Sequence, residues 1–193
     1  MRFPAFALLL LLIVPLATKA RAPTLARIEA TELNRRLLAS PSATATLRQW
    51  CAEHGVADPI IRAEVIKTPP PPATAAQRRE LQVDAREPLG YRRVRLGCAG
   101  HVLSEAQNWY VPSRLTPEMN TALIGTDTPF GTVVAPLRIS RRNLAVELLW
   151  RHGAQPPARL FRHRALVLDA DQRPIAEVIE TYQREAVALR TAG

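Results

Sequence analysis

The sequence predicts an α+β protein with a single antiparallel β-sheet of about six strands and helices packed on one face. Two helical segments come first, and strand-like segments joined by short turns dominate the rest, which is the order expected of this architecture. The chain has 193 residues, of which 47% are hydrophobic. This is enough for one domain with a full hydrophobic core. No internal repeat divides the chain.

Three helices are predicted from spacing and capping. Apolar residues recur at helical intervals across residues 25–38. Ser42 can cap a second helix over residues 43–54, because its hydroxyl can accept a hydrogen bond from a free backbone N–H of the first turn. Thr116 occupies the same position before a third helix, which has proline at its first helical position and ends near Gly125.

The strands are predicted from alternation and from β-branched apolar runs. Val94 and Leu96 alternate with Arg93 and Arg95, as in a strand with one face exposed. The proline-rich residues 69–74 cannot join a helix or a sheet interior, so we expect an exposed loop there. The strand candidates are residues 60–66, 91–98, 101–111, 144–150, 165–168 and 175–182.

Residues 1–20 have the layout of a signal peptide. A basic start at Arg2 precedes the apolar run of residues 5–16, and small residues follow. The apolar run is short for a transmembrane helix. We therefore expect cleavage after Ala20, which leaves residues 21–193 as one periplasmic or secreted domain without stable membrane insertion. An uncleaved membrane anchor is the alternative.

Composition limits the kinds of partner. The formal net charge of +9 suits an anionic ligand as well as an anionic surface. The basic residues are scattered without a nucleic-acid motif, so we expect no nucleic-acid partner. No metal-ligand spacing and no nucleotide motif is present, and we expect a monomer without metal or cofactor. Cys51 and Cys98 can form one disulfide in an oxidising compartment, or Cys98 can remain a buried free thiol, and the sequence leaves both open.

Several short motifs recur in one order along the chain. They are Ser42-Ala43-Thr44 on an early helix, Arg93 five residues before Cys98, Val111-Pro112 at a strand end, the corner Thr128-Pro129-Phe130-Gly131, and Glu177 shortly after Pro174. In this order they resemble the chorismate lyase family, small α+β enzymes that remove pyruvate from chorismate. The UTRA ligand-binding domains of bacterial regulators are similar in architecture.

The resemblance implies roles for individual residues. Arg93 would hold the ring carboxylate of the substrate, since a guanidinium can donate two parallel hydrogen bonds to a carboxylate. Glu177 would take part in proton transfer as the second catalytic residue. Phe130 would form an apolar wall of the pocket, and backbone amides near Gly131 would shape it.

Two further positions complete the expected substrate site. Arg164, or its neighbour Arg162, would serve the second carboxylate. Asn108 stands where chorismate lyases carry an arginine, and we include it among the substrate-binding residues. Glu180 and Glu185 are expected to be surface acids.

Three functions follow as hypotheses. The first is an enzyme of the chorismate lyase type, which eliminates pyruvate from chorismate or a related cyclic carboxylate to give 4-hydroxybenzoate. The second is a non-catalytic protein, exported to the periplasm, that binds a small anionic aromatic or cyclic carboxylate on the same fold. The third is an envelope scaffold that binds no ligand. The first two require Arg93 and Glu177 to face one closed cavity, whereas the third does not.

Overall fold

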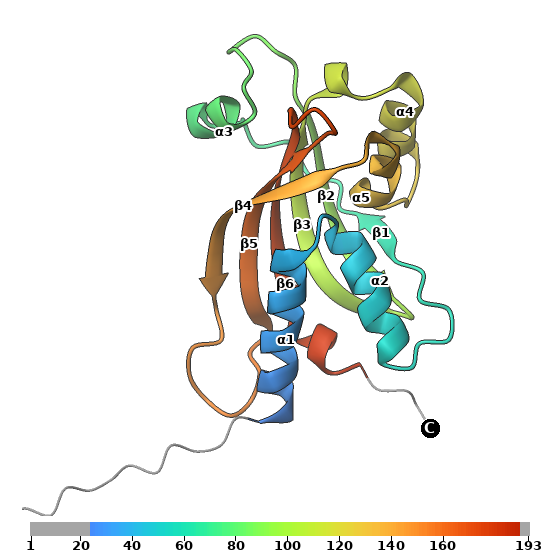
Figure 1. Ribbon diagram of the computed structural model, residues 1–193, viewed down its shortest axis with the longest axis vertical. Coiled ribbons are helices and arrows are strands. Elements are labelled where there is room, and N and C mark those ends of the chain that lie inside the picture. The colour runs from blue at the N-terminus through green and yellow to red at the C-terminus, as the bar shows by residue number, and fades with distance from the viewer. Residues whose placement is uncertain (1–23, 190–193) are drawn as a thin grey trace, which may run out of the picture.

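The computed structural model describes residues 24–189, so the predicted signal peptide lies outside the described residues. Within them, six strands form one antiparallel sheet in the order β1-β2-β3-β6-β5-β4 (Figure 1). The predicted α+β class and single antiparallel sheet are therefore confirmed. The strands are β1 (Arg62–Val65), β2 (Gly90–Cys98), β3 (His101–Tyr110), β4 (Ser140–Leu148), β5 (Arg159–Leu168) and β6 (Pro174–Gln183).

Four helices pack on one face of the sheet, which we call the inner face. In Figure 1, α1 and α2 cross in front of the strands, and α4 and α5 gather at the upper right. Buried leucines of α1 and α2 share one core cluster with Phe161 and Tyr182 of the sheet. The helices are α1 (Leu25–Ala39), α2 (Ala43–Glu53), α3 (Ala75–Glu80), α4 (Pro117–Gly125) and α5 (Phe130–Val133), with 3-10 turns η1 (Pro112–Arg114), η2 (Ala135–Leu137) and η3 (Arg184–Val187).

The short helix α3 departs from the expected arrangement of helices on one face. The segment around it packs against Trp109 and Leu166, whose side chains lie on the opposite face, called here the outer face. Thr74 and Gln77 form a capping box that starts α3. The proline-rich residues before Thr74 form the exposed loop that the sequence predicted. The other four helices lie on one face as expected, although α5 itself was not predicted from the sequence.

Strand boundaries on the β4 and β5 side differ from the prediction by several residues. We expected strands over residues 144–150 and 165–168, but β4 begins at Ser140 and β5 begins at Arg159. Both added stretches are rich in arginine, so they lack the apolar run that marks a strand in the sequence. Pairing with the neighbouring strands supplies the hydrogen bonds that make them strands.

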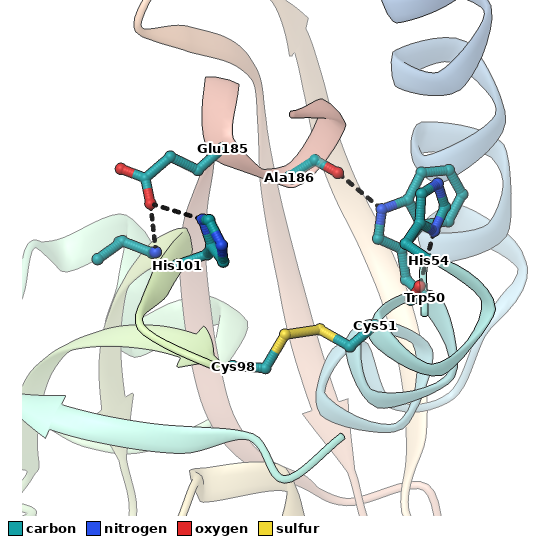
Figure 2. Close-up of a disulfide and its surroundings, with 8 residues drawn as sticks. Trp50, Cys51, His54, Cys98, His101, Glu185 and Ala186 are labelled. Carbon is teal, nitrogen blue, oxygen red and sulfur yellow. Dashed lines mark hydrogen bonds and ion pairs between the residues drawn. A yellow bond between two sulfur atoms is a disulfide. The ribbon is translucent and has the colours of Figure 1, made fainter. Parts of the chain in front are cut away.

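A disulfide fastens α2 to the sheet. Cys51 of α2 is bonded to Cys98 at the end of β2, and both residues are buried (Figure 2). On the same helix, the indole Nε1 of Trp50 donates a hydrogen bond of 2.7 Å to the carbonyl oxygen of Ala186 in η3. The open question about the two cysteines is thus answered in favour of the disulfide.

The turn η3 is itself held against the β2–β3 turn. The carboxylate of Glu185 accepts a hydrogen bond of 2.6 Å from the backbone N–H of Val102, and it lies 4.0 Å from Nδ1 of His101 (Figure 2). The side chain of Glu185 is half-exposed, as expected of a surface acid. It nevertheless links the η3 turn to the β2–β3 turn.

Across residues 24–189, no helix combines the length and the hydrophobicity that a membrane span requires.

We expect the double substitution Cys51→Ser/Cys98→Ser to lower the free energy of unfolding by about 4 kcal/mol, because the bond closes a long loop and restricts the unfolded chain. The two cysteines are 47 residues apart. Urea denaturation with and without a reducing agent measures the effect. Reductant should lower the midpoint of the wild type and leave that of the double variant unchanged. Equal urea midpoints for the wild type and the double variant in the absence of reductant would contradict a stabilising role of the disulfide.

Candidate functional site

Alternation along the strands assigns every candidate residue to one face. Successive side chains of a strand point to opposite faces. In β2, Arg92, Val94 and Leu96 are buried on the inner face, whereas Arg93 and Arg95 are only partly buried and lie on the outer face.

Arg93 and Glu177 are each bonded to a different neighbour. Both lie on the outer face, but Arg93 pairs with Glu105, with 3.3 Å between Nη2 and Oε2. Glu177 is completely buried, and its Oε1 accepts a hydrogen bond of 2.8 Å from Nε of Arg164. The structure thus brings Arg164 and Glu177 together and pairs Arg93 with a different acid on the same face, so a ligand shared by all three stays a prediction.

The two-residue period of a strand explains why Arg93 lies on the outer face and its neighbour Arg92 on the inner face. A shift of one position in the alignment moves a side chain from one face to the other. Arg92, one residue before Arg93, lies on the inner face and donates hydrogen bonds to the carbonyl oxygens of Thr126 and Thr128. Burial lowers the pKa of Arg92. This arginine anchors the loop before α5.

The other three predicted binding residues do meet, on the inner face. Phe130, Gly131 and Asn108 all line one pocket between the sheet, α2 and α5. We call it the inner pocket. Its walls are mainly apolar, and they include Val94, Leu96, Ala106, Ile139, Val167 and Val178.

Two of the motifs from the sequence form one side of the inner pocket. Gly131 packs against the hydroxyls of Ser42 and Thr44 at the start of α2. A Cβ at position 131 would lie 2.9 Å from Oγ1 of Thr44 and 3.1 Å from Oγ of Ser42. Glycine is therefore required for α5 to approach α2 this closely. The Ser-Ala-Thr element and the Thr-Pro-Phe-Gly corner belong to the same structural unit.

Asn108 supplies an unpaired amide to the pocket. It is 3% exposed and is the β3 partner of Arg92 in the sheet register. No side-chain hydrogen bond of Asn108 is found within residues 24–189, and its amide atoms are not among the fully enclosed polar atoms that lack a partner. The amide therefore borders the pocket space, where water or a ligand group can bond it.

Sequence reasoning missed a buried ion pair at the base of the inner pocket. Arg141 of β4 and Glu180 of β6 approach to 2.5 Å across β5, and their side chains are only 3% and 7% exposed. Both residues line the pocket. The expectation that Glu180 is a surface acid is therefore wrong. Glu180 is two residues away from each of the apolar Val178 and Tyr182. In a strand this spacing places all three side chains on one face, so the sequence could have predicted that Glu180 lies on the inner face.

The ion pair is fixed by its surroundings. The hydroxyl of Tyr182 donates a hydrogen bond of 3.1 Å to Oε2 of Glu180. Burial alone would lower the pKa of Arg141, but the charge and hydrogen bond of Glu180 outweigh it and raise that pKa. Burial, together with Glu180, raises the pKa of Tyr182. Arg141 thus stays charged and Tyr182 stays neutral at physiological pH.

A buried histidine lies beside this pair. His163 of β5 is 0% exposed. Its Nε2 lies 2.6 Å from Oδ1 of Asn34 in α1, so this nitrogen donates. Its Nδ1 has no partner among residues 24–189. Burial lowers the pKa of His163 to about 4, a shift that Glu180 opposes and Arg141 assists.

The inner pocket is narrow. Its empty volume is about 430 Å³, but only about 30 Å³ is wide enough for the centre of a water molecule. That is room for about two waters. A ligand with an aromatic or cyclic ring therefore requires the contact between α2 and α5 to open.

The described residues contain no cluster of three or more histidine, cysteine, aspartate or glutamate side chains that could bind a metal ion. The chemistry offered by the pocket is that of an apolar slot. Its polar groups are one amide, two hydroxyls and one neutralised ion pair.

No family model matches the chain. The chain is 39% identical over 181 residues to the uncharacterized protein y4mC of Sinorhizobium fredii (strain NBRC 101917 / NGR234), and the match covers 82% of this chain and 76% of y4mC.

Two solved structures are similar in fold. The effector domain of PhnF from Mycobacterium smegmatis matches with a TM-score of 0.49 and 14% identity, covering 64% of this chain and 81% of that one. The C-terminal domain of Yurk from Bacillus subtilis matches with a TM-score of 0.45 and 14% identity, covering 62% of this chain and 88% of that one. Both likenesses are distant and concern the fold alone.

We expect His163 to make the protein less stable as the pH falls from 6.5 towards 4. Its pKa is 6.5 in the unfolded chain and about 4 in the fold, so only the unfolded state gains a proton in this window. The loss amounts to about 3 kcal/mol. Urea denaturation of the wild type and of His163→Gln at pH 7 and pH 4.5 measures it. The stability difference between the two proteins should change with pH, and parallel pH profiles would contradict the assignment.

Proposed function

The chain belongs to the same family as y4mC, and we propose that it is a binding protein for a small carboxylate-bearing molecule held in the inner pocket. The observation that carries this proposal is the Asn108 amide, which borders a mainly apolar slot and has no side-chain hydrogen bond within the described residues. Ligand sites are typically apolar concavities with a few convergent polar groups. The inner pocket has this composition.

The polar groups suit an acid on an apolar ring. Asn108 offers two N–H donors, and the hydroxyls of Ser42 and Thr44 can donate from the opposite wall. Phe130 and the aliphatic wall residues offer a surface for a ring. Arg141 adds a guanidinium whose charge is already neutralised by Glu180. Because this pair is neutral overall, a carboxylate in the inner pocket would be held by hydrogen bonds and not by a free positive charge.

Binding without turnover is the form that the chemistry favours. An elimination of pyruvate needs a group that accepts and returns a proton. Among the described residues, Glu180 is the carboxylate that lines the pocket, and it is already bonded to Arg141 and Tyr182. Glu177, the expected proton-transfer residue, is bonded to Arg164 on the outer face.

Chorismate lyase activity is the second candidate. The observation in its favour is the meeting of Ser42, Thr44 and Gly131 in one wall, since these belong to the motifs that resemble that family. On this proposal, chorismate would occupy the inner pocket and release pyruvate there.

We also propose that the chain acts in an oxidising compartment outside the cytoplasm. The disulfide between Cys51 and Cys98 supports this, because stable disulfides are rare where thiols are kept reduced. The predicted signal peptide points the same way. The monomeric state remains a prediction.

We expect Asn108→Leu to weaken binding of 4-hydroxybenzoate at least about tenfold, since a lost hydrogen bond to a charged group costs about 1.5–3 kcal/mol. The change removes the amide and keeps the side-chain volume similar. Gln107→Leu is the matched control, because Gln107 is the adjacent β3 residue and lies on the outer face. Titration calorimetry on the oxidised protein measures both. Equal losses in the two variants, or no binding by the wild type, would refute the proposed site.

The same proteins should be incubated with chorismate while pyruvate is measured. We expect binding of chorismate without release of pyruvate. Release by the wild type that is absent in Asn108→Leu would instead establish the lyase.

A further inference from the structure

A second pocket lies beside the inner pocket, on the helix-covered side of the sheet. We call it the outer basin because it lies outside the inner pocket, and it is not on the outer face. It lies between α2 and the η2 turn, and the volume that the centres of water molecules can occupy in it is about 260 Å³. Ser42, Thr44, Gly131 and Ile139 line both the inner pocket and the outer basin. These shared residues are the neck between the two spaces. Gly131 packs against Ser42 and Thr44 in the neck, so a ligand in the inner pocket can extend through it when the contact between α2 and α5 opens.

Two arginines lie beyond the neck. Arg48 follows Thr44 by four residues on α2, so both side chains lie on the same side of the helix. Arg138 ends η2 with a left-handed backbone, φ 51° and ψ 52°, immediately before Ile139. Both arginines line the outer basin. Helix α2 and the η2 turn thus bring together two cations that are far apart in the sequence.

Neither arginine is neutralised within the described residues. Most other arginines of residues 24–189 are bonded through their side chains to carboxylates or carbonyl oxygens, as Arg36 is to Glu32 and Glu53. Arg48 and Arg138 form no side-chain hydrogen bond and no ion pair there, and no carboxylate lines the outer basin. The basin therefore combines two guanidinium groups with no acid, which favours an anion.

We propose that the outer basin binds a second acidic group of the ligand, so that the ligand is a small cyclic or aromatic dicarboxylate or a ring carrying one carboxylate and one phosphate. This inference rests on the proposed function, because the first acidic group occupies the inner pocket. Arg48 and Arg138 take the role that the sequence assigned to Arg162 or Arg164. Those two arginines lie on the outer face and pair with Glu147 and Glu177.

The test compares two acids that differ at one end of the ring. 4-Hydroxybenzoate has one carboxylate and a para hydroxyl, whereas terephthalate has a carboxylate at both para positions. By titration calorimetry on the full chain, terephthalate should bind at least about fivefold more tightly, which matches about 1 kcal/mol for a solvent-accessible ion pair. The preference should shrink as the ionic strength rises.

Arg48→Gln/Arg138→Gly should abolish the preference for terephthalate and change the affinity for 4-hydroxybenzoate by no more than about twofold. Glycine at position 138 accepts the left-handed backbone, so the variant should fold. Arg79→Gln/Arg86→Gln removes the same charge from exposed positions elsewhere and should keep the preference. It therefore controls for the overall charge.

The outcomes separate the two proposals. Equal affinities of the wild type for the two acids, or a preference that survives Arg48→Gln/Arg138→Gly, would overturn the second-acid site and leave the inner pocket standing. If neither acid binds the wild type, the proposed function fails, and the second-acid site fails with it.

Discussion

The attachment of α2 to the inner face is the constraint on which the pocket depends. The disulfide and the Trp50 hydrogen bond fix the C-terminal end of α2. Its N-terminal end is then held over β2 and β3, where Ser42 and Thr44 meet Gly131. A covalent bond limits motion at one end only. The other end, at the neck between the inner pocket and the outer basin, rests on non-covalent contacts and is where the pocket can widen.

The floor of the pocket is polar although it lies in the core. A buried ion pair gains little net stability, because desolvation offsets the attraction between the charges, but removal of one partner leaves a costly unpaired charge. Arg141 and Glu180 connect β4 to β6 across β5. The pair therefore fixes how the edge strand sits relative to the centre of the sheet. His163 stays neutral next to it, so this cluster of three side chains carries no net charge at neutral pH.

The distribution of charge separates two roles within the same region. The inner pocket has balanced charge and free hydrogen-bond donors, so it can orient an acid on an apolar ring. The outer basin has unbalanced positive charge, so it can attract and select an anion. On the outer face, Glu177 is completely buried, is bonded to the partly exposed Arg164 and does not line the inner pocket. This arrangement is the one on which the proposed binding function rests.

The sequence by itself determined the α+β class, the antiparallel sheet, the capped helices and the meeting of Gly131 with Phe130 and Asn108, because local periodicity, capping and motif order carry that information. It could not decide which of two adjacent residues faces the pocket, so it did not show that Arg92 lies on the inner face or that Glu180 lines the pocket. A strand exposes alternate residues to opposite sides, and only the packing of helices determines which side becomes the interior. The disulfide, the Arg141–Glu180 pair and the outer basin were decided by tertiary structure, because each joins residues distant in the sequence.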